Sequence, residues 1–274
     1  MQKQMKIGSR IFDLNRHTYV MAILNVTPDS FSDGGSYKNL DDVLYRAEEM
    51  MQEGADILDI GGESTRPGHT VIGDDEEISR VAPVIEAITK RLDIPVSIDT
   101  YKSAVAKAAL QSGAHMVNDI WGLQYDAAMA GVIAQAGAAC CLMHNQNGTQ
   151  YDNFLPDCMK TLQKSVDIAK QAGISPEQIM LDPGVGFGKT YEQNLLVMQN
   201  LQAYHQLGYP MLLGTSRKSM IGLALDLPVE QRLEGTLVTT VMAAQAGWNF
   251  VRVHDVKENV RAIRMTETIL NSSL

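Results

Sequence analysis

The sequence contains few cysteines, and its basic residues are outnumbered by acidic ones. Its three cysteines are Cys140, Cys141 and Cys158. Neighbouring residues on a strand point to opposite faces, so Cys140 and Cys141 suit neither a disulfide with each other nor a shared metal. We expect reduced, buried thiols, as in a cytoplasmic protein. Lysine and arginine number 23 against 32 acidic residues, and the net charge of −9 argues against a nucleic-acid-binding or anionic membrane surface.

Long apolar runs are also missing. No stretch approaches the roughly 18 apolar residues that a membrane span requires. The initial segment MQKQMKIGSRIF has no apolar signal-peptide core, so we expect a cytoplasmic location and no membrane partner. The 274 residues are 45% hydrophobic, which is enough to bury a large core as one domain.

The sequence does contain a repeated alternation of helical patterns and short, nearly all-apolar runs. Such runs are typical of parallel strands that are covered on both faces. Six of the runs follow a Gln-x-Gly triplet, whose glycine suits the position just past the end of a helix. Two more runs lack the triplet but share the pattern. The eight predicted strands lie at residues 19–25, 57–60, 94–99, 115–120, 139–144, 179–182, 211–216 and 250–255.

Eight apolar strands that alternate with helical patterns predict an α/β protein, a single-domain (β/α)8 TIM barrel. Such a barrel takes roughly 250 residues and carries its active site at the carboxyl ends of the strands. Residues 1–17 precede the first long run and contain the turn signals Gly8 and Asn15. They predict a strand-turn-strand lead-in hairpin that covers the lower mouth of a barrel at residues 18–274.

Helical periodicity predicts the outer layer of this barrel. The helical pattern at 78–88 contains Pro83, so we expect a kink or a break near Ala82. Two connections, at 26–38 and 61–73, are long and rich in glycine, hydroxyl groups and charge, which is typical of lids or substrate clamps. The remaining predicted helices lie at 40–53, 102–112, 126–136, 157–172, 191–206, 230–246 and 256–270.

Polar residues lie at the tips of several predicted strands. Those at the tips of the third, fourth, sixth and seventh strands are Asp99, Asn118, Asp182 and Lys218. Carboxylates accept pairs of N–H bonds, an amide donates and accepts, and an ammonium only donates. Together they suit a flat heterocycle such as an aminopyrimidinone. Two alternatives remain: a metal site made of the two carboxylates with His144, and a Schiff-base lysine at Lys218, which we expect to be solvated instead.

A second polar set combines Asn25, Arg252 and His254. Arg252 and His254 alternate along the last strand and therefore point to the same side. A guanidinium, an imidazole and an amide suit a phosphorylated group, and Asn25 could join a Mg²⁺ ion held mainly by diphosphate oxygens. In a closed barrel the first strand adjoins the eighth, which brings Asn25 to this set. The alternative for Arg252 is a structural ion pair with Asp255 or Glu258.

The stretch LDPGVGFGKT at 181–190 lacks the spacing of a phosphate-binding glycine loop. We interpret it as a tight turn from a strand to a helix. Its glycines let the backbone approach a ligand closely, and Phe187 could lie over a flat ring.

Seven motifs are spread over almost the whole chain after residue 20. They are LNVTPDSFSDGG (24–35), DIGGESTRPG (59–68), SIDTYK (97–102), VNDI (117–120), LDPGVGFGK (181–189), GTSRKSMIG (214–222) and RVHDV (252–256). Together they resemble the dihydropteroate synthase family, the folate-pathway enzymes that sulfonamides inhibit. The resemblance implies a pterin-binding TIM barrel and a transferase that condenses (7,8-dihydropterin-6-yl)methyl diphosphate with 4-aminobenzoate. The products would be 7,8-dihydropteroate and diphosphate. A Mg²⁺ cofactor and a homodimer formed through the later helices are also implied.

The resemblance further implies roles for individual residues. The pterin pocket would be formed by Asp99, Asn118, Ile120, Met143, Asp182, Gly214 and Lys218. The diphosphate would be held by Asn25, Arg252 and His254, with Mg²⁺ on Asn25. The 4-aminobenzoate would meet Phe187 and Ser219, and the two long loops would order around the substrates through Asp33, Thr65, Arg66 and Pro67. The implied catalytic residues are Asp33, Arg66, Lys218, Arg252 and His254.

None of these side chains is an obvious nucleophile. We therefore expect an SN1-like displacement, in which the site stabilises the leaving diphosphate. Asp33, Asp99 and Asp182 would stabilise the pterin cation until the amine attacks. A pterin-binding methyltransferase and a pterin-binding protein without catalysis are the rival functions, and the diphosphate set argues against both. Glu63 and His144 receive no role.

Overall fold

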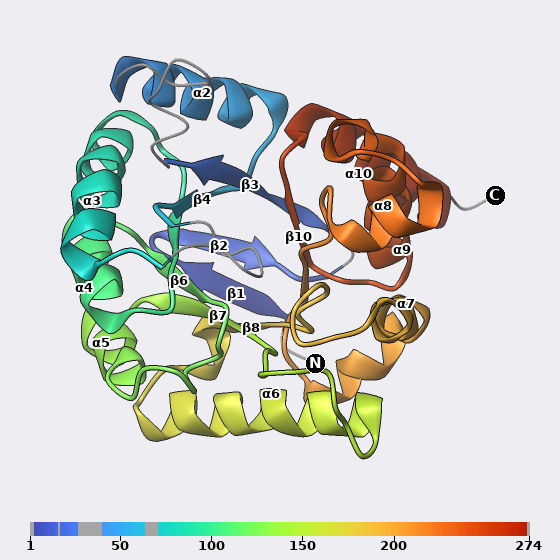
Figure 1. Cartoon of the computed structure of the whole chain (residues 1–274). Helices are drawn as coiled ribbons and strands as arrows, with labels where there is room; N and C mark the ends of the chain where they lie inside the picture. The colour runs from blue at the N-terminus through green and yellow to red at the C-terminus, as the bar shows by residue number, and fades with distance from the viewer. Residues whose placement is uncertain (1–2, 16, 27–39, 64–70, 273–274) are drawn as a thin grey trace.

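The computed structural model describes residues 3–15, 17–26, 40–63 and 71–272. Within these ranges eight parallel strands form the predicted (β/α)8 barrel (Figure 1). They are β3 (Tyr19–Asn25), β4 (Ile57–Gly61), β5 (Val96–Asp99), β6 (Met116–Asp119), β7 (Ala139–Met143), β8 (Ile179–Asp182), β9 (Leu212–Leu213) and β10 (Phe250–Val253). Their order in the sheet is β8-β7-β6-β5-β4-β3-β10-β9. A bridge between Leu181 and Met211 joins the two ends, so the sheet closes.

Helices surround the barrel, as Figure 1 shows. The α-helices are α2 (Leu40–Glu53), α3 (Asp74–Arg91), α4 (Ser103–Gln111), α5 (Met129–Ala136), α6 (Phe154–Gln171), α7 (Tyr191–Gln199), α8 (Ser219–Leu225), α9 (Leu233–Gln245) and α10 (Val256–Leu270). Short 3-10 helices are η1 (Pro176–Gln178), η2 (Leu201–Leu207) and η3 (Val229–Gln231). Within the described ranges, no helix is both long enough and apolar enough to span a membrane.

The alternation of side chains along each strand separates two apolar layers. On β7, Cys140 packs in the outer layer between the strands and the helices, and Cys141 packs inside the barrel. Both thiols are free and buried, as predicted from their adjacency. The predicted role of the Gln-x-Gly triplets is confirmed as well, because their glycines all have positive φ: Gly54, Gly113, Gly137, Gly173, Gly208 and Gly247.

Two expectations about the helices are wrong. We expected a kink or a break near Ala82, and the break is wrong, because helix α3 runs unbroken through Pro83. A proline inside a helix costs about 3 kcal/mol. Burial of Val81, Val84, Ile85 and Ile88 against the strands offsets this, at about 1.5–3 kcal/mol for each large side chain. The helix predicted at 191–206 is instead two pieces, α7 and η2, because the backbone leaves the helical region at Asn200 (φ −119°, ψ 27°).

The predicted lead-in hairpin is present. Strands β1 (Gln4–Ile7) and β2 (Arg10–Asp13) pair antiparallel. Their buried side chains are Met5, Ile7 and Phe12, which pack against the first inward-facing residues of the barrel strands, including Met21 and Phe250. The hairpin thus covers the amino-terminal mouth of the barrel, and the polar residues gather at the opposite end.

Candidate active site

Three polar residues of the first predicted set lie at or next to the carboxyl ends of barrel strands. Asp99 ends β5, Asp182 ends β8, and Asn118 is the register partner of Asp99 on β6. All three are at most 5% exposed. The layer of barrel interior next to the hairpin is apolar, so the polar groups mark the floor of a site at the carboxyl ends of the strands.

The guanidinium of Arg252 lies between two carboxylates. Its Nε donates to Asp59 Oδ2 at 2.5 Å, and its Nη2 donates to Asp99 Oδ2 at 2.7 Å. The alternative partners Asp255 and Glu258 are wrong, because the ion pairs of Arg252 are with Asp59 and Asp99. Asp255 instead accepts from Arg217 Nε at 3.0 Å. The first and eighth strands adjoin as predicted, since β10 pairs with β3. Arg252 therefore reaches across the barrel interior to both carboxylates.

Sequence reasoning missed Asp59. It lies in the middle of β4 within an apolar run, is fully buried, and accepts a 3.1 Å hydrogen bond from Asn118 Nδ2. Its position along the strand could have revealed Asp59, because residues two apart on a strand share a face. Ile57, two residues before it, faces the inside of the barrel. Among the described residues, Asp59 Oδ1 and Asp99 Oδ1 have no hydrogen-bond partner. A buried carboxylate oxygen without a donor indicates a place for the N–H groups of a ligand.

The ammonium of Lys218 also belongs to this site. It donates to the Val185 carbonyl at 2.6 Å and lies 4.7 Å from the centre of the Phe187 ring. The expectation of a solvated lysine is therefore wrong, because the loop that carries Val185 and Phe187 folds over it. A Cβ built on Gly214 would lie 3.5 Å from Asp182 Oδ2 and 3.8 Å from Lys218 Nζ. Gly214 thus lies against two polar residues of the same site.

The ionisation of this group is shifted by burial. Burial raises the pKa of Asp99 to about 7, with the Arg252 guanidinium opposing the shift and Asp59 adding to it. Burial also raises the pKa of Asp182, against the effect of Lys218. Burial lowers the pKa of Lys218 to about 8, although Asp182 raises it. These side chains can bind a polar ring, and their own protonation states can change near neutral pH.

An apolar wall borders the polar floor. The predicted substrate-binding residues Ile120, Met143 and Phe187 pack in one cluster, together with Tyr101 and Trp121. The last two were not predicted; each is an aromatic residue two positions past the end of a strand, which was the available signal. An apolar wall with a few convergent polar groups is typical of a pocket for a flat ligand.

The second predicted set lies on two paired strands, with Asn25 on β3 and Arg252 and His254 at the end of β10. His254 Nδ1 lies 2.9 Å from Ser216 Oγ, just past the end of β10. Asn25 ends β3, and a Cβ built on the neighbouring Gly61 would lie 3.4 Å from its Oδ1. In the described part of the chain, no group of three His, Cys, Asp or Glu residues could hold a metal ion. An amide oxygen such as that of Asn25 fits Mg²⁺ only when a substrate supplies further oxygens.

The remaining predicted residues fall into two groups. Ser219 is the first residue of α8, directly after Lys218, and is exposed. The others lie outside the described residues: Asp33, Thr65, Arg66 and Pro67.

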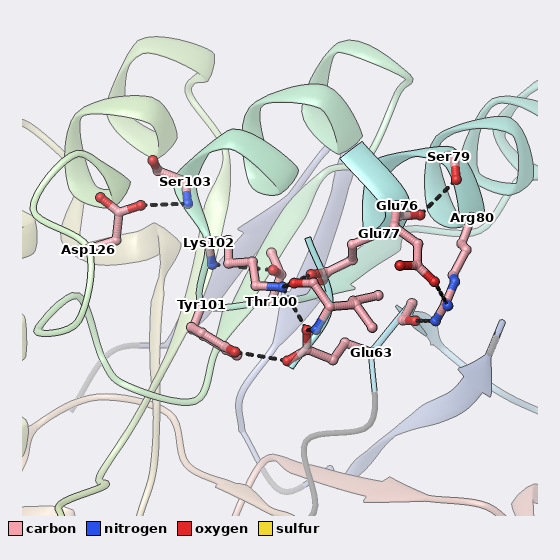
Figure 2. A network of polar contacts seen from close by, with 12 residues as sticks. Glu63, Glu76, Glu77, Ser79, Arg80, Thr100, Tyr101, Lys102, Ser103 and Asp126 are labelled. Atoms are coloured by element: carbon pink, nitrogen blue, oxygen red, sulfur yellow. Dashed lines mark hydrogen bonds and ion pairs between the residues drawn. The ribbon is translucent and has the colours of Figure 1, made fainter. Parts of the chain in front are cut away.

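Glu63, which received no role from the sequence, belongs to a buried charge network (Figure 2). Lys102 Nζ donates to Glu63 Oε2 at 2.6 Å and to Glu77 Oε2 at 2.8 Å. Tyr101 donates its hydroxyl to Glu63 Oε1 at 2.8 Å. The network joins the end of β4 to α3 and to the segment after β5. Since Tyr101 also packs in the apolar wall, the network supports that wall from behind.

Comparison with known proteins agrees with this geometry. The chain matches the pterin binding enzyme family over residues 21–254. It is 56% identical over 267 residues to a dihydropteroate synthase of Clostridium beijerinckii, covering 97% of this chain and 99% of that protein. A dihydropteroate synthase structure from Clostridium difficile, determined in the presence of pteroic acid, is 53% identical with a TM-score of 0.92 and covers 95% and 100% of the two chains. A Yersinia pestis dihydropteroate synthase in complex with a sulfonamide drug is 41% identical, with a TM-score of 0.92 and coverage of 98% and 100%.

The chain therefore belongs to the pterin-binding enzyme family. Within that family its place is among the dihydropteroate synthases, the transferases of folate biosynthesis that sulfonamides target.

Proposed function

We propose that this chain condenses (7,8-dihydropterin-6-yl)methyl diphosphate with 4-aminobenzoate at the carboxyl ends of β5, β6, β8 and β10. The observation that supports this most is the buried polar floor with its apolar wall. Asp99 Oδ1 has no partner among the described residues and would accept N–H groups of the pterin edge. Asn118 and Asp182 would complete that edge, with Lys218 donating to a ring acceptor and Gly214, Ile120 and Met143 lining the ring.

We assign the diphosphate to Asn25, Arg252 and His254. Arg252 has five N–H donors, of which its pairs with Asp59 and Asp99 use two. The remaining donors can bind diphosphate oxygens while the two carboxylates hold the guanidinium group in place. Mg²⁺, bound by the diphosphate and Asn25, would supply a Lewis acid that neutralises leaving-group charge.

The mechanism that fits these residues is an SN1-like displacement. Arg252 and His254 stabilise the departing diphosphate. Asp99 and Asp182, buried beside the pterin, stabilise the positive charge that spreads into the ring, and we assign the same role to Asp33. Thr65, Arg66 and Pro67 would exclude water around the reacting carbon. Scrambling of the bridging oxygen of the diphosphate without 4-aminobenzoate is the expected signature, and its complete absence would contradict the stepwise path.

We place 4-aminobenzoate between the Phe187 ring and the start of α8. The Lys218 ammonium lies over one face of Phe187, so the ring is part of the polar site. Ser219 follows Lys218 and is exposed, and its hydroxyl and the N–H groups at the start of the helix would meet the carboxylate. The amine of the substrate would then point towards the pterin.

We further propose a cytoplasmic homodimer whose barrel begins at residue 18, after the lead-in at 1–17. The free buried cysteines suit a reducing compartment. Exposed apolar side chains gather on three neighbouring helices, α8, α9 and α10, and would form the interface: Leu223, Leu225, Val238, Met265, Ile269 and Leu270.

The direct test is turnover of the two substrates with diphosphate release as the readout. Asp182→Ala should weaken binding of a pterin that lacks the diphosphate, and Arg252→Ala should weaken mainly binding of the diphosphate ester. A silent wild-type protein would overturn the assignment. Pterin binding without turnover would support the non-catalytic alternative, and methyl transfer without diphosphate release would support a methyltransferase.

A further inference from the structure

The loop between β8 and α7 carries two groups of the site, the Val185 carbonyl and the Phe187 ring. Hydrogen bonds from other elements fix its backbone. Gly184 N donates to Asp182 Oδ1 at 2.7 Å, and Gly186 N donates to Asn194 Oδ1 at 2.7 Å. Tyr151 donates its hydroxyl to the Gly188 carbonyl at 2.6 Å. The geometry of this loop is therefore set from outside it.

Lys189 is itself a residue of this loop and is 9% exposed. Its ammonium donates to the carbonyls of Gly184 and Phe187, both at 3.0 Å, and lies 2.8 Å from His144 Nδ1. An ammonium has three protons and no acceptor, so His144 Nδ1 must accept the third. His144 is then neutral and carries its proton on Nε2. Its full burial, together with the neighbouring Lys189, lowers its pKa to about 3 and agrees with the neutral form.

The loop lies directly on the segment that carries His144. Gly184 has φ +70°, and a Cβ there would lie 2.0 Å from the His144 carbonyl oxygen. The His144 amide in turn donates to the Asp182 carbonyl at 2.8 Å. His144 is thus fixed by the barrel itself, and it can hold the lysine in one place.

The position of Phe187 depends on the Lys189 ammonium more than the position of Asp182 does. Its carbonyl accepts directly from Lys189, and its amide donates at 3.1 Å to the Gly184 carbonyl, which Lys189 also contacts. Asp182, by contrast, is fixed by the pairing of β8 with β7. Loss of the ammonium should therefore move Phe187 and the Val185–Lys218 contact before it moves Asp182.

We propose that Lys189, held by His144, is a positioning residue for the 4-aminobenzoate side of the site. It orients the 184–187 backbone so that Phe187 faces the Lys218 ammonium. This inference rests on the proposed function, because it assumes that Phe187 and Lys218 border the second substrate.

The test is steady-state kinetics on the full chain, with Lys189→Met as the main variant and Lys164→Met, an exposed lysine on α6, as the control. We expect Lys189→Met to raise the KM for 4-aminobenzoate about tenfold or more, the effect of losing charge-assisted hydrogen bonds, while affinity for the pterin changes little. Lys164→Met should match the wild type in both. An equal loss of pterin affinity, or an unchanged KM, would overturn the proposal.

His144 gives a second test that leaves the lysine in place. Asn can present its Oδ1 near the position of His Nδ1, whereas Leu has no acceptor. His144→Asn should keep the KM for 4-aminobenzoate closer to the wild-type value than His144→Leu does, and equal KM values would contradict a role through Lys189. A silent wild type would overturn the proposed function and this inference together. An active wild type with no KM effect in these variants would overturn this inference alone.

Discussion

Arg252 and Asp99 are in direct contact, with Nη2 2.7 Å from Oδ2, although the sequence assigns them to different substrate groups. Arg252 belongs to the predicted diphosphate set and Asp99 to the predicted pterin edge. Their contact means that the two subsites share one buried ion pair. A change at either residue should therefore affect both subsites, and in particular the protonation of Asp99.

The first prediction concerns pH. Asp99 accepts ligand N–H groups only as a carboxylate, and burial raises its pKa to about 7. Lys218 donates best as an ammonium, and burial lowers its pKa to about 8. Activity should therefore fall below about pH 7, as Asp99 gains a proton, and above about pH 8, as Lys218 loses one. The measurement is kcat/KM for the pterin substrate against pH, which reports groups of the free enzyme.

Two variants separate the limbs of this profile. Asp99→Asn should remove the acid limb, and Lys218→Met should remove the alkaline limb, each with a lower plateau. If both limbs persist unchanged in both variants, other groups control the profile.

The second prediction follows from the shared ion pair. Arg252→Met removes the cation that opposes the effect of burial on Asp99. The pKa of Asp99 should then rise further, so binding of a pterin without diphosphate should require a higher pH than in the wild type. Calorimetric titrations at several pH values measure this shift, and Arg264→Met, an exposed arginine on α10, is the matched control. A pH dependence identical to the wild type would show that Arg252 does not influence Asp99.

The barrel could be predicted because its signal is local and repeated. Each strand is a short apolar run, and the closing glycines mark where helices end. Polar residues at strand ends were equally visible, because they interrupt the apolar pattern. Asp59 was not, because it lies inside such a run and its partner Arg252 is 193 residues away in the sequence.

Lys218 shows that the position of a residue can be predicted from the sequence when its environment cannot. Its place after a strand was read correctly, but its environment depends on the loop after β8, which comes from an earlier part of the chain. Pro83 was misread for a related reason. Its helix survives through tertiary burial, which no local pattern contains.

The third prediction addresses Asp59. Asp59→Asn keeps the shape and an acceptor for Asn118 but removes one of the two carboxylates that hold Arg252. We expect the free energy of unfolding to fall by about 1–3 kcal/mol, because Arg252 is left with Asp99 as its carboxylate partner. The KM for the diphosphate substrate should also rise, since the guanidinium is held less firmly. Urea unfolding and steady-state kinetics measure the two effects. A variant equal to the wild type in both would contradict a role of Asp59 in holding Arg252.

The fourth prediction concerns the network of Glu63, Glu77 and Lys102. Lys102 is 8% exposed, and Glu63 and Glu77 are at most 4% exposed. Burial alone would lower the pKa of Lys102, but its bonds to the two carboxylates raise it, so the ammonium is present at neutral pH. Lys102→Met would leave two buried carboxylates without their cation, and breaking such a buried pair costs about 3–5 kcal/mol.

Urea unfolding at pH 7 measures this loss, and Lys107→Met, an exposed lysine on α4, the helix that begins directly after Lys102, is the matched control. A further change, Glu77→Gln in the Lys102→Met background, removes one of the uncompensated charges and should restore part of the stability. If the double variant is no more stable than Lys102→Met alone, the cost lies in lost packing of the lysine side chain and not in unpaired charge. If Lys102→Met lowers the free energy of unfolding by less than about 1 kcal/mol, the loss is no larger than that of an exposed ion pair. That result would contradict the role of burial.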